Sequence, residues 1–254
     1  MKVDLLFSSP WLNAAGSLGF SLDRRLPFDL GWLGAFVTNP ISLRARYPAR
    51  DRLLLPFPGG FLLHTGWPNP GLSQAIRRHA GRWVRSPLPV IVHLLAEGPE
   101  ELAAMVRRLE TVEGVMGIEV GWPPDCQPDL ARAIVAAAQG ELPVVARLPF
   151  EQAAQLVKSV EGTSFAAISL GPPRGSLPNS LGGLVHGRLY GPALFPRALN
   201  LVHELVQLGM KVIAAGGVYH PNEAQAMLDA GALAVQFDAA LWTRRIVPAE
   251  SLLE

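Results

Sequence analysis

The stretch VIVHLLAEGPEELAAMVRRLETVEGVMGIEV, residues 90–120, predicts one strand–helix–strand unit. The apolar run 90–94 indicates a buried strand, and Pro99 followed by two glutamates indicates the first turn of a helix that extends to residue 110. A second apolar run, 117–120, provides the next strand. Strands that are apolar on both faces are typical of parallel sheets covered by helices. This stretch therefore favours an α/β fold.

The same alternation continues along the chain. Further strands are expected at 11–15, 34–38, 143–148, 166–170, 211–215 and 233–237, and further helices at 73–84, 129–138, 151–159, 196–208, 222–229 and from 240 onward. Eight strands alternating with helices in 254 residues predict one (β/α)8 TIM barrel, a single domain over residues 1–254. A doubly wound open sheet is the alternative, which the absence of a GxGxxG motif after the first strand weakens. The proline-rich stretch 40–70 is interpreted as an elaborated loop.

The composition excludes several classes of protein. Twenty-two basic residues against 21 acidic ones give a net charge of +1, so there is no electrostatic basis for binding nucleic acid or an anionic membrane. No apolar run reaches the roughly 18 residues of a spanning helix, and the N-terminal MKVDLLFSSPW does not resemble a signal peptide. We therefore expect a cytoplasmic protein. Cys126 is the single cysteine, and the histidines show no metal-binding spacing, so neither a disulfide nor a metal is expected.

In a TIM barrel, the residues that follow the strands form the functional face. The candidates are Ala14, Ala15 and Gly16 after the first strand, Asn39 after the second, Arg147 at the end of the fifth, Gly216 and Gly217 after the seventh, and Asp238 and Ala239 after the eighth. The loops after strands seven and eight often bind phosphate through backbone N–H groups. A carboxylate repels phosphate there unless it turns away or caps the final helix, and capping is the favoured interpretation of Asp238. Arg147 has apolar neighbours, so we expect it to be paired or to face a ligand.

Few side chains in this sequence are suited to carry protons at that face. The candidates are His64, His93 and Cys126. Cys126 follows the fourth strand as a possible nucleophile or base, with a small apolar filler as the alternative. His64 lies two residues before Gly66, and a surface histidine without function is the alternative. The three lysines of the chain, Lys2, Lys158 and Lys211, are not expected at the strand ends, which disfavours Schiff-base chemistry.

Several short motifs occur in an order that resembles one known family. They are Asn13-Ala14-Ala15-Gly16, the second strand 34–38, Pro58-Gly59-Gly60-Phe61, the segment GWPNPG at 66–71, GPAL at 191–194, Gly216-Gly217-Val218 and the stretch 230–236. Over nearly the whole chain this order resembles the dihydroorotate dehydrogenase family of FMN-dependent barrels. The resemblance implies an FMN whose phosphate lies at Gly216, Gly217 and the backbone near Asp238 and Ala239. It places the isoalloxazine near Ala14, Ala15 and Gly16, with a homodimer as the expected assembly.

The departures from that family fall on its chemistry. Asn39 and Arg147 stand where the family has lysines, and its Cys or Ser base falls on Pro124, with Cys126 two positions further on. The family's substrate-binding asparagines correspond to Leu63, Gly121, Cys126 and either Leu170 or Gly171. One hypothesis is an FMN-dependent oxidoreductase that acts on a small molecule other than dihydroorotate, with Cys126 and His64 as catalytic candidates. The other is a non-catalytic barrel that binds a ligand or a partner protein.

Overall fold

A computed structural model describes residues 5–22, 30–51, 53–160, 162–163, 165–179 and 182–242. Eight parallel strands form a ring, in the order β1 (Trp11–Asn13), β13 (Ala234–Phe237), β12 (Val212–Ala215), β9 (Ala167–Leu170), β8 (Val144–Leu148), β7 (Val115–Gly121), β6 (Val90–Leu95) and β2 (Phe36–Val37). A parallel bridge between Leu12 and Ala35 joins the two ends of this order. The predicted (β/α)8 barrel is therefore confirmed, and the open-sheet alternative is wrong.

The seam between β1 and β2 combines a backbone bond, from the Gly34 N–H to the Trp11 carbonyl oxygen at 2.8 Å, with contacts from one side chain. The Asn13 amide donates to the carbonyl oxygen of Val37 at 2.7 Å, and its oxygen accepts from the Val37 N–H at 2.8 Å. Asn13 is completely buried. Its amide thus makes the pair of bonds that a neighbouring strand would make. Because β2 is only two residues long, these two bonds close the barrel where backbone pairing is sparse.

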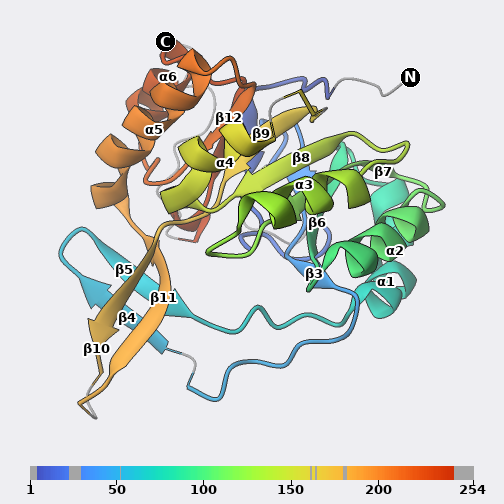
Figure 1. The fold of residues 1–254 in the computed structure, drawn as a ribbon, viewed down its shortest axis with the longest axis horizontal. Helices are drawn as coiled ribbons and strands as arrows, with labels where there is room; N and C mark the ends of the chain where they lie inside the picture. Colours follow the sequence, from blue (N-terminus) through green and yellow to red (C-terminus); the bar gives the residue numbers. More distant parts are fainter. Residues whose placement is uncertain are drawn as a thin grey trace.

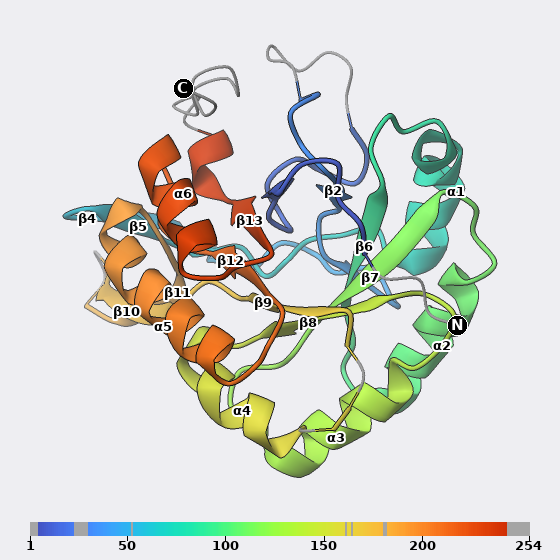
Figure 2. The ribbon, with the colours of Figure 1, turned by 90° about the horizontal axis from the view of Figure 1, so that it is seen from above.

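Helices line most of the outside of the strand ring, as Figure 2 shows from above. They are α1 (Leu72–Val84), α2 (Pro99–Leu109), α3 (Pro128–Ala137), α4 (Ala153–Ser159), α5 (Phe195–Gln207) and α6 (Pro221–Asp229), with 3-10 turns η1 (Phe150–Gln152), η2 (Pro192–Leu194) and η3 (Ala239–Leu241). Their apolar faces pack on the outer side of the strands. The helix expected from residue 240 begins as η3, and residues 243–254 lie outside the described part. Within the described ranges, no helix is long and apolar enough to span a bilayer.

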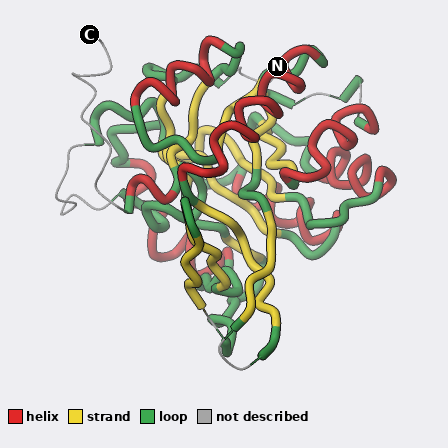
Figure 3. Tube along the Cα trace, turned by 90° about the vertical axis from the view of Figure 1, so that its left-hand side faces the viewer, coloured by secondary structure: helices red, strands yellow, loops and turns green. Residues whose placement is uncertain are grey.

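A second, antiparallel sheet projects from the barrel (Figures 1 and 3). Its strand order is β10 (Arg174–Pro178), β11 (Leu184–Tyr190), β5 (Gly60–His64) and β4 (Leu53–Phe57), and a short strand β3 (Ile41–Ser42) pairs with β6. The interpretation of residues 40–70 as a loop is therefore wrong for β3, β4 and β5. The proline and glycine in LLLPF and RGSLP are rare in strands, and β5 pairs with β11, more than a hundred residues away in the sequence, as in Phe61 with Tyr190.

The barrel interior contains two chemically different layers. The deeper layer is apolar and consists of Leu12, Ala35, Val37, Ile91, Val145, Ala167, Ile213 and Ala234 with their neighbour Ala15. Successive inward-facing positions of a strand are two residues apart. Two residues beyond Ile91, Val145 and Ala167 the sequence has His93, Arg147 and Ser169. The layer nearest the carboxyl ends of the strands, which we call the barrel mouth, is therefore polar.

Candidate functional site

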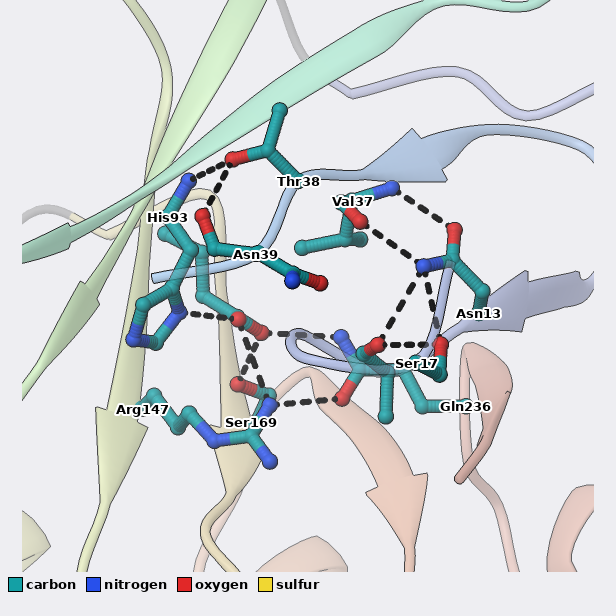
Figure 4. A network of polar contacts seen from close by, with 11 residues as sticks. Asn13, Ser17, Val37, Thr38, Asn39, His93, Arg147, Ser169 and Gln236 are labelled. Carbon is teal, nitrogen blue, oxygen red and sulfur yellow. Dashed lines mark hydrogen bonds and ion pairs between the residues drawn. The ribbon is translucent and has the colours of Figure 1, made fainter. Parts of the chain in front are cut away.

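The polar layer is centred on the carboxylate of Glu119, which comes from β7 and is completely buried. His93 Nδ1 lies 2.6 Å and Arg147 Nη1 3.2 Å from its Oε2. The Ser169 hydroxyl and the Gln236 amide donate to Oε1 at 2.6 and 2.8 Å. Arg147 also donates to the Gln236 side-chain oxygen at 3.2 Å (Figure 4). Five strands of the barrel, β6, β7, β8, β9 and β13, thus each contribute one member of a connected network.

The charges in this network are fixed by its contacts. Burial alone would raise the pKa of Glu119, but the guanidinium of Arg147 and the hydrogen bonds from His93 and Ser169 hold that pKa far below its usual range. Burial lowers the pKa of His93 despite the adjacent carboxylate, so the imidazole is neutral and donates through Nδ1. Glu119 and Arg147 therefore form a buried ion pair. Since all four acceptor directions of the Glu119 carboxylate are in use, its role is to position Arg147.

Arg147 meets the expectation for a charged residue among apolar neighbours, because it is paired with Glu119. Sequence reasoning did not single out Glu119, Ser169 or Gln236 as members of a site. Ser169 and Gln236 occupy equivalent positions in their strands. Each lies inside an otherwise apolar strand, in ISL and AVQF, two residues after a position of the apolar layer. That register is the signal that identifies them as inward-facing.

His64 is placed away from the network. It ends β5 and pairs with Leu53 of β4 in the projecting sheet. Its neighbours Phe61 and Leu63 pack against the buried cluster of Tyr190, Tyr219, Ala239 and Ala240. Because side chains alternate along a strand, His64 faces the side opposite to Phe61 and Leu63.

Cys126 is also placed away from the barrel interior. Its side chain, 2% exposed, belongs to the core between the strands and the helices. The backbone N–H of Cys126 donates to the Gln152 side chain at 3.1 Å, and the thiol faces the Gln127 carbonyl oxygen at 3.7 Å. Burial raises the pKa of the thiol, which keeps it protonated. The structure thus favours the apolar-filler interpretation.

The turn after β1 is compact and covered by a tryptophan. Ser17 donates to the Ala14 carbonyl oxygen at 2.6 Å, and Gly16 has a φ of 96°. A Cβ at Gly16 would lie 3.1 Å from Cζ3 of Trp67, so the indole packs directly against this turn. Asn39, the other candidate here, accepts from the Gly19 N–H at 3.0 Å and donates its own N–H to the Gly19 carbonyl oxygen at 2.7 Å.

A second buried cation, not anticipated from the sequence, lies beside Trp67. Arg188 comes from β11 and is 8% exposed, and its Cζ lies 3.5 Å from the centre of the Trp67 ring. Its guanidinium donates to Thr65 Oγ1 at 3.1 Å and to the Tyr190 hydroxyl at 3.2 Å. In the described part of the chain no acidic side chain forms an ion pair with Arg188. In the sequence, Arg188 follows a glycine-rich segment that does not predict a strand. Only the pairing of β11 with β5 shows that Arg188 is buried in a sheet.

The ends of β12 and β13 bring four of the candidates together. Ala215 of β12 pairs with Gln236 of β13, and continuing that register places Gly217 beside Asp238. The Asp238 carboxylate accepts from the Ala239 N–H at 2.5 Å, so the predicted capping role is confirmed at η3. Gly216 has a φ of 109° and Gly217 a φ of 74°, and both turn the chain toward the start of α5.

Metal-binding groups are sparse in this structure. Among the residues whose placement is described, no three histidine, cysteine, aspartate or glutamate side chains form a group that could hold a metal ion. Glu119 and His93 are the two such groups in direct contact at the barrel mouth, and both are engaged in the network.

Comparisons with known proteins give one consistent result. The chain is 29% identical to the catalytic subunit of dihydroorotate dehydrogenase B (NAD(+)) of Desulforudis audaxviator, over 91% of this chain and 82% of that protein. It is 28% identical to the corresponding subunit of Trichlorobacter lovleyi, over 93% and 84%. It is 26% identical to dihydroorotate dehydrogenase A (fumarate) of Lacticaseibacillus paracasei, over 94% and 91%. No family model matches the chain.

Proposed function

We propose that this chain, which is a divergent member of the dihydroorotate dehydrogenase family, is an oxidoreductase of that type whose substrate is not dihydroorotate. The relatives, aligned over nine-tenths of the chain, support the oxidoreductase part. One observation carries the substrate part: the thiol of Cys126 is buried outside the barrel interior. By the resemblance, counted without a gap from Glu119, the family's base falls on Pro124, whose side chain cannot accept a proton.

The groups that would recognise a polar ring are also replaced. Leu63 packs into an aromatic cluster, and Gly121 offers no side chain beside His93. A dihydroorotate ring would lose hydrogen-bonding partners at these positions, which lowers affinity strongly when the groups are buried. Arg147 and Arg188 are the buried cations that a substrate would meet, so the substrate we propose carries an anionic group.

The residues present only partly suit FMN, the cofactor that the family resemblance implies. Arg147, held by Glu119 and Gln236, is suited to face an electron-rich ring edge. At the phosphate end, the Asp238 carboxylate is hydrogen-bonded to the Ala239 N–H, one of the backbone donors that a phosphate would need. FMN does not fit these residues as they lie.

A second candidate function is a non-catalytic barrel that binds a ligand or a partner protein. The observation that favours it is that the chain's own side chains occupy both places that the resemblance assigns to a flavin. Trp67 packs against Gly16, and Asp238 occupies a backbone donor at the end of β13.

Flavin uptake followed by reduction separates these candidates. The purified protein is mixed with FMN or with riboflavin, separated from free flavin, and its flavin absorbance is recorded before and after dihydroorotate and a chemical reductant are added. The oxidoreductase proposal expects a retained flavin that the chemical reductant bleaches and dihydroorotate does not. Failure to retain either flavin would favour the non-catalytic barrel, and bleaching by dihydroorotate would refute the altered substrate.

A further inference from the structure

The end of β13 is the point where this chain departs most clearly from a phosphate-binding barrel. Gly216 and Gly217 provide a turn without side chains, and both have positive φ. A Cβ at Gly217 would lie 2.3 Å from the backbone nitrogen of Phe195, so only glycine fits there. The adjacent strand presents Asp238 at the same level. We call the space between these two strand ends, at Gly216, Gly217, Asp238 and Ala239, the anion cradle. Its β12 side is backbone without side chains, and its β13 side has a carboxylate.

The Asp238 carboxylate lies at the start of η3. Asp238 is 8% exposed, and its Oδ1 accepts from the Ala239 N–H at 2.5 Å. Burial raises the pKa of Asp238 to about 6, while the Ala239 N–H, Arg147 and the amides of Asp238 and Ala240 act in the opposite direction. The carboxylate is therefore ionised at neutral pH, and it draws on the backbone amides at the start of η3. These amides are the donors with which a barrel of this kind holds a phosphate.

We propose that Asp238 is a built-in substitute for a bound phosphate, so that the barrel mouth excludes FMN and accepts ligands that carry no phosphate at this end. Two effects act together. The carboxylate occupies the amides, and its negative charge repels the phosphate dianion at contact distance. Among flavins, the form that this site would accept is riboflavin, which ends in a neutral hydroxyl group.

This inference deepens the proposed function, because it specifies the cofactor class of the same site, but it rests on the geometry of Asp238 and not on turnover. The decisive experiment measures the FMN dissociation constant of the full-length protein and of Asp238→Gly. Freeing the amides and removing the charge is expected to tighten FMN binding about 100-fold. Riboflavin binding is expected to change less than about threefold. Inorganic phosphate, used as a second probe, should raise the melting temperature of the variant alone.

Two further variants make the result decisive. Asp125→Gly removes a carboxylate from an exposed loop position with a φ of 58°, where glycine is well tolerated, and it should leave FMN binding unchanged. Asp238→Asn keeps the shape of the side chain and removes its charge, so it should also tighten FMN binding. This variant provides the test if Asp238→Gly fails to fold. Circular dichroism establishes folding in each case.

Three outcomes would overturn the proposal. The first is a wild-type protein that binds FMN as tightly as Asp238→Gly does. The second is a folded variant that gains no affinity for FMN. The third is a gain in riboflavin affinity as large as the gain in FMN affinity. All of these measurements are of binding. If the protein shows no oxidoreductase activity, the proposed function is refuted but this inference is not. An inactive wild-type protein whose Asp238→Gly variant binds FMN more tightly supports this inference alone. An active wild-type protein whose variant gains no FMN affinity supports the proposed function alone.

Discussion

Replacing Glu119 with glutamine tests whether the buried network is a single energetic unit. The glutamine side chain retains one oxygen, so the carboxylate side facing His93 and Arg147 or the side facing Ser169 and Gln236 becomes an NH2 group opposite hydrogen-bond donors. Arg147 also loses its counter-ion in a place where it is 8% exposed. Breaking a buried ion pair from one side costs about 3–5 kcal/mol.

Urea unfolding monitored by circular dichroism measures this loss directly. For a chain of this size, the expected loss corresponds to a melting temperature lower by roughly 6–20 °C. The matched control is Glu204→Gln, the same change at an exposed position of α5, which should alter stability by less than about 0.5 kcal/mol. If Glu119→Gln were within about 1 kcal/mol of the wild type, the network would be soft or hydrated, and the positioning of Arg147 by Glu119 would be refuted.

Three further predictions concern Asn13 at the seam between β1 and β2, the carboxylate of Asp238 and the thiol of Cys126. Asn13→Ala removes both side-chain bonds to Val37 and should destabilise the fold by about 2–4 kcal/mol in urea unfolding; a loss below about 1 kcal/mol would show that the side chain does not hold the seam. Because the pKa of Asp238 is raised to about 6 in the folded state, its contribution to stability is full below about pH 4 and is lost as the pH rises to about 6. The wild type should therefore lose up to about 3 kcal/mol relative to Asp238→Asn across that window, and a pH-independent difference contradicts this. Cys126 is buried and its thiol pKa is raised, so alkylation by iodoacetamide, followed by mass spectrometry, should be at least about 100-fold slower in native protein than in urea; equal rates would place the thiol at the surface.

The barrel was predictable because its strands are mostly apolar, with one polar residue near the carboxyl end of several of them. Runs such as 90–95 and 144–148 are buried on both faces, and that burial is visible in the sequence as an absence of alternation. The projecting sheet was not predictable in the same way. Its strands contain proline and glycine, alternate in exposure, and find partners across long sequence separations, as β5 does with β11. Local patterns carry no information about such pairing.

The candidate site was predictable only in part. The strand-end rule identified Arg147, Gly216, Gly217 and Asp238, because the ends of parallel strands meet at one edge of the barrel. The rule failed for Cys126, because the loop after β7 places its thiol in the core between the strands and the helices and not inside the barrel. Arg188 escaped the rule altogether, since it lies in a strand of the projecting sheet.

The most direct test of this view of the barrel mouth is a crystal structure of the wild-type protein grown with excess FMN. The expected density shows the Asp238 carboxylate on the backbone amides at the start of η3, with no phosphate between β12 and β13. Density for an FMN phosphate at Gly216 and Gly217, with Asp238 displaced from Ala239, would contradict it.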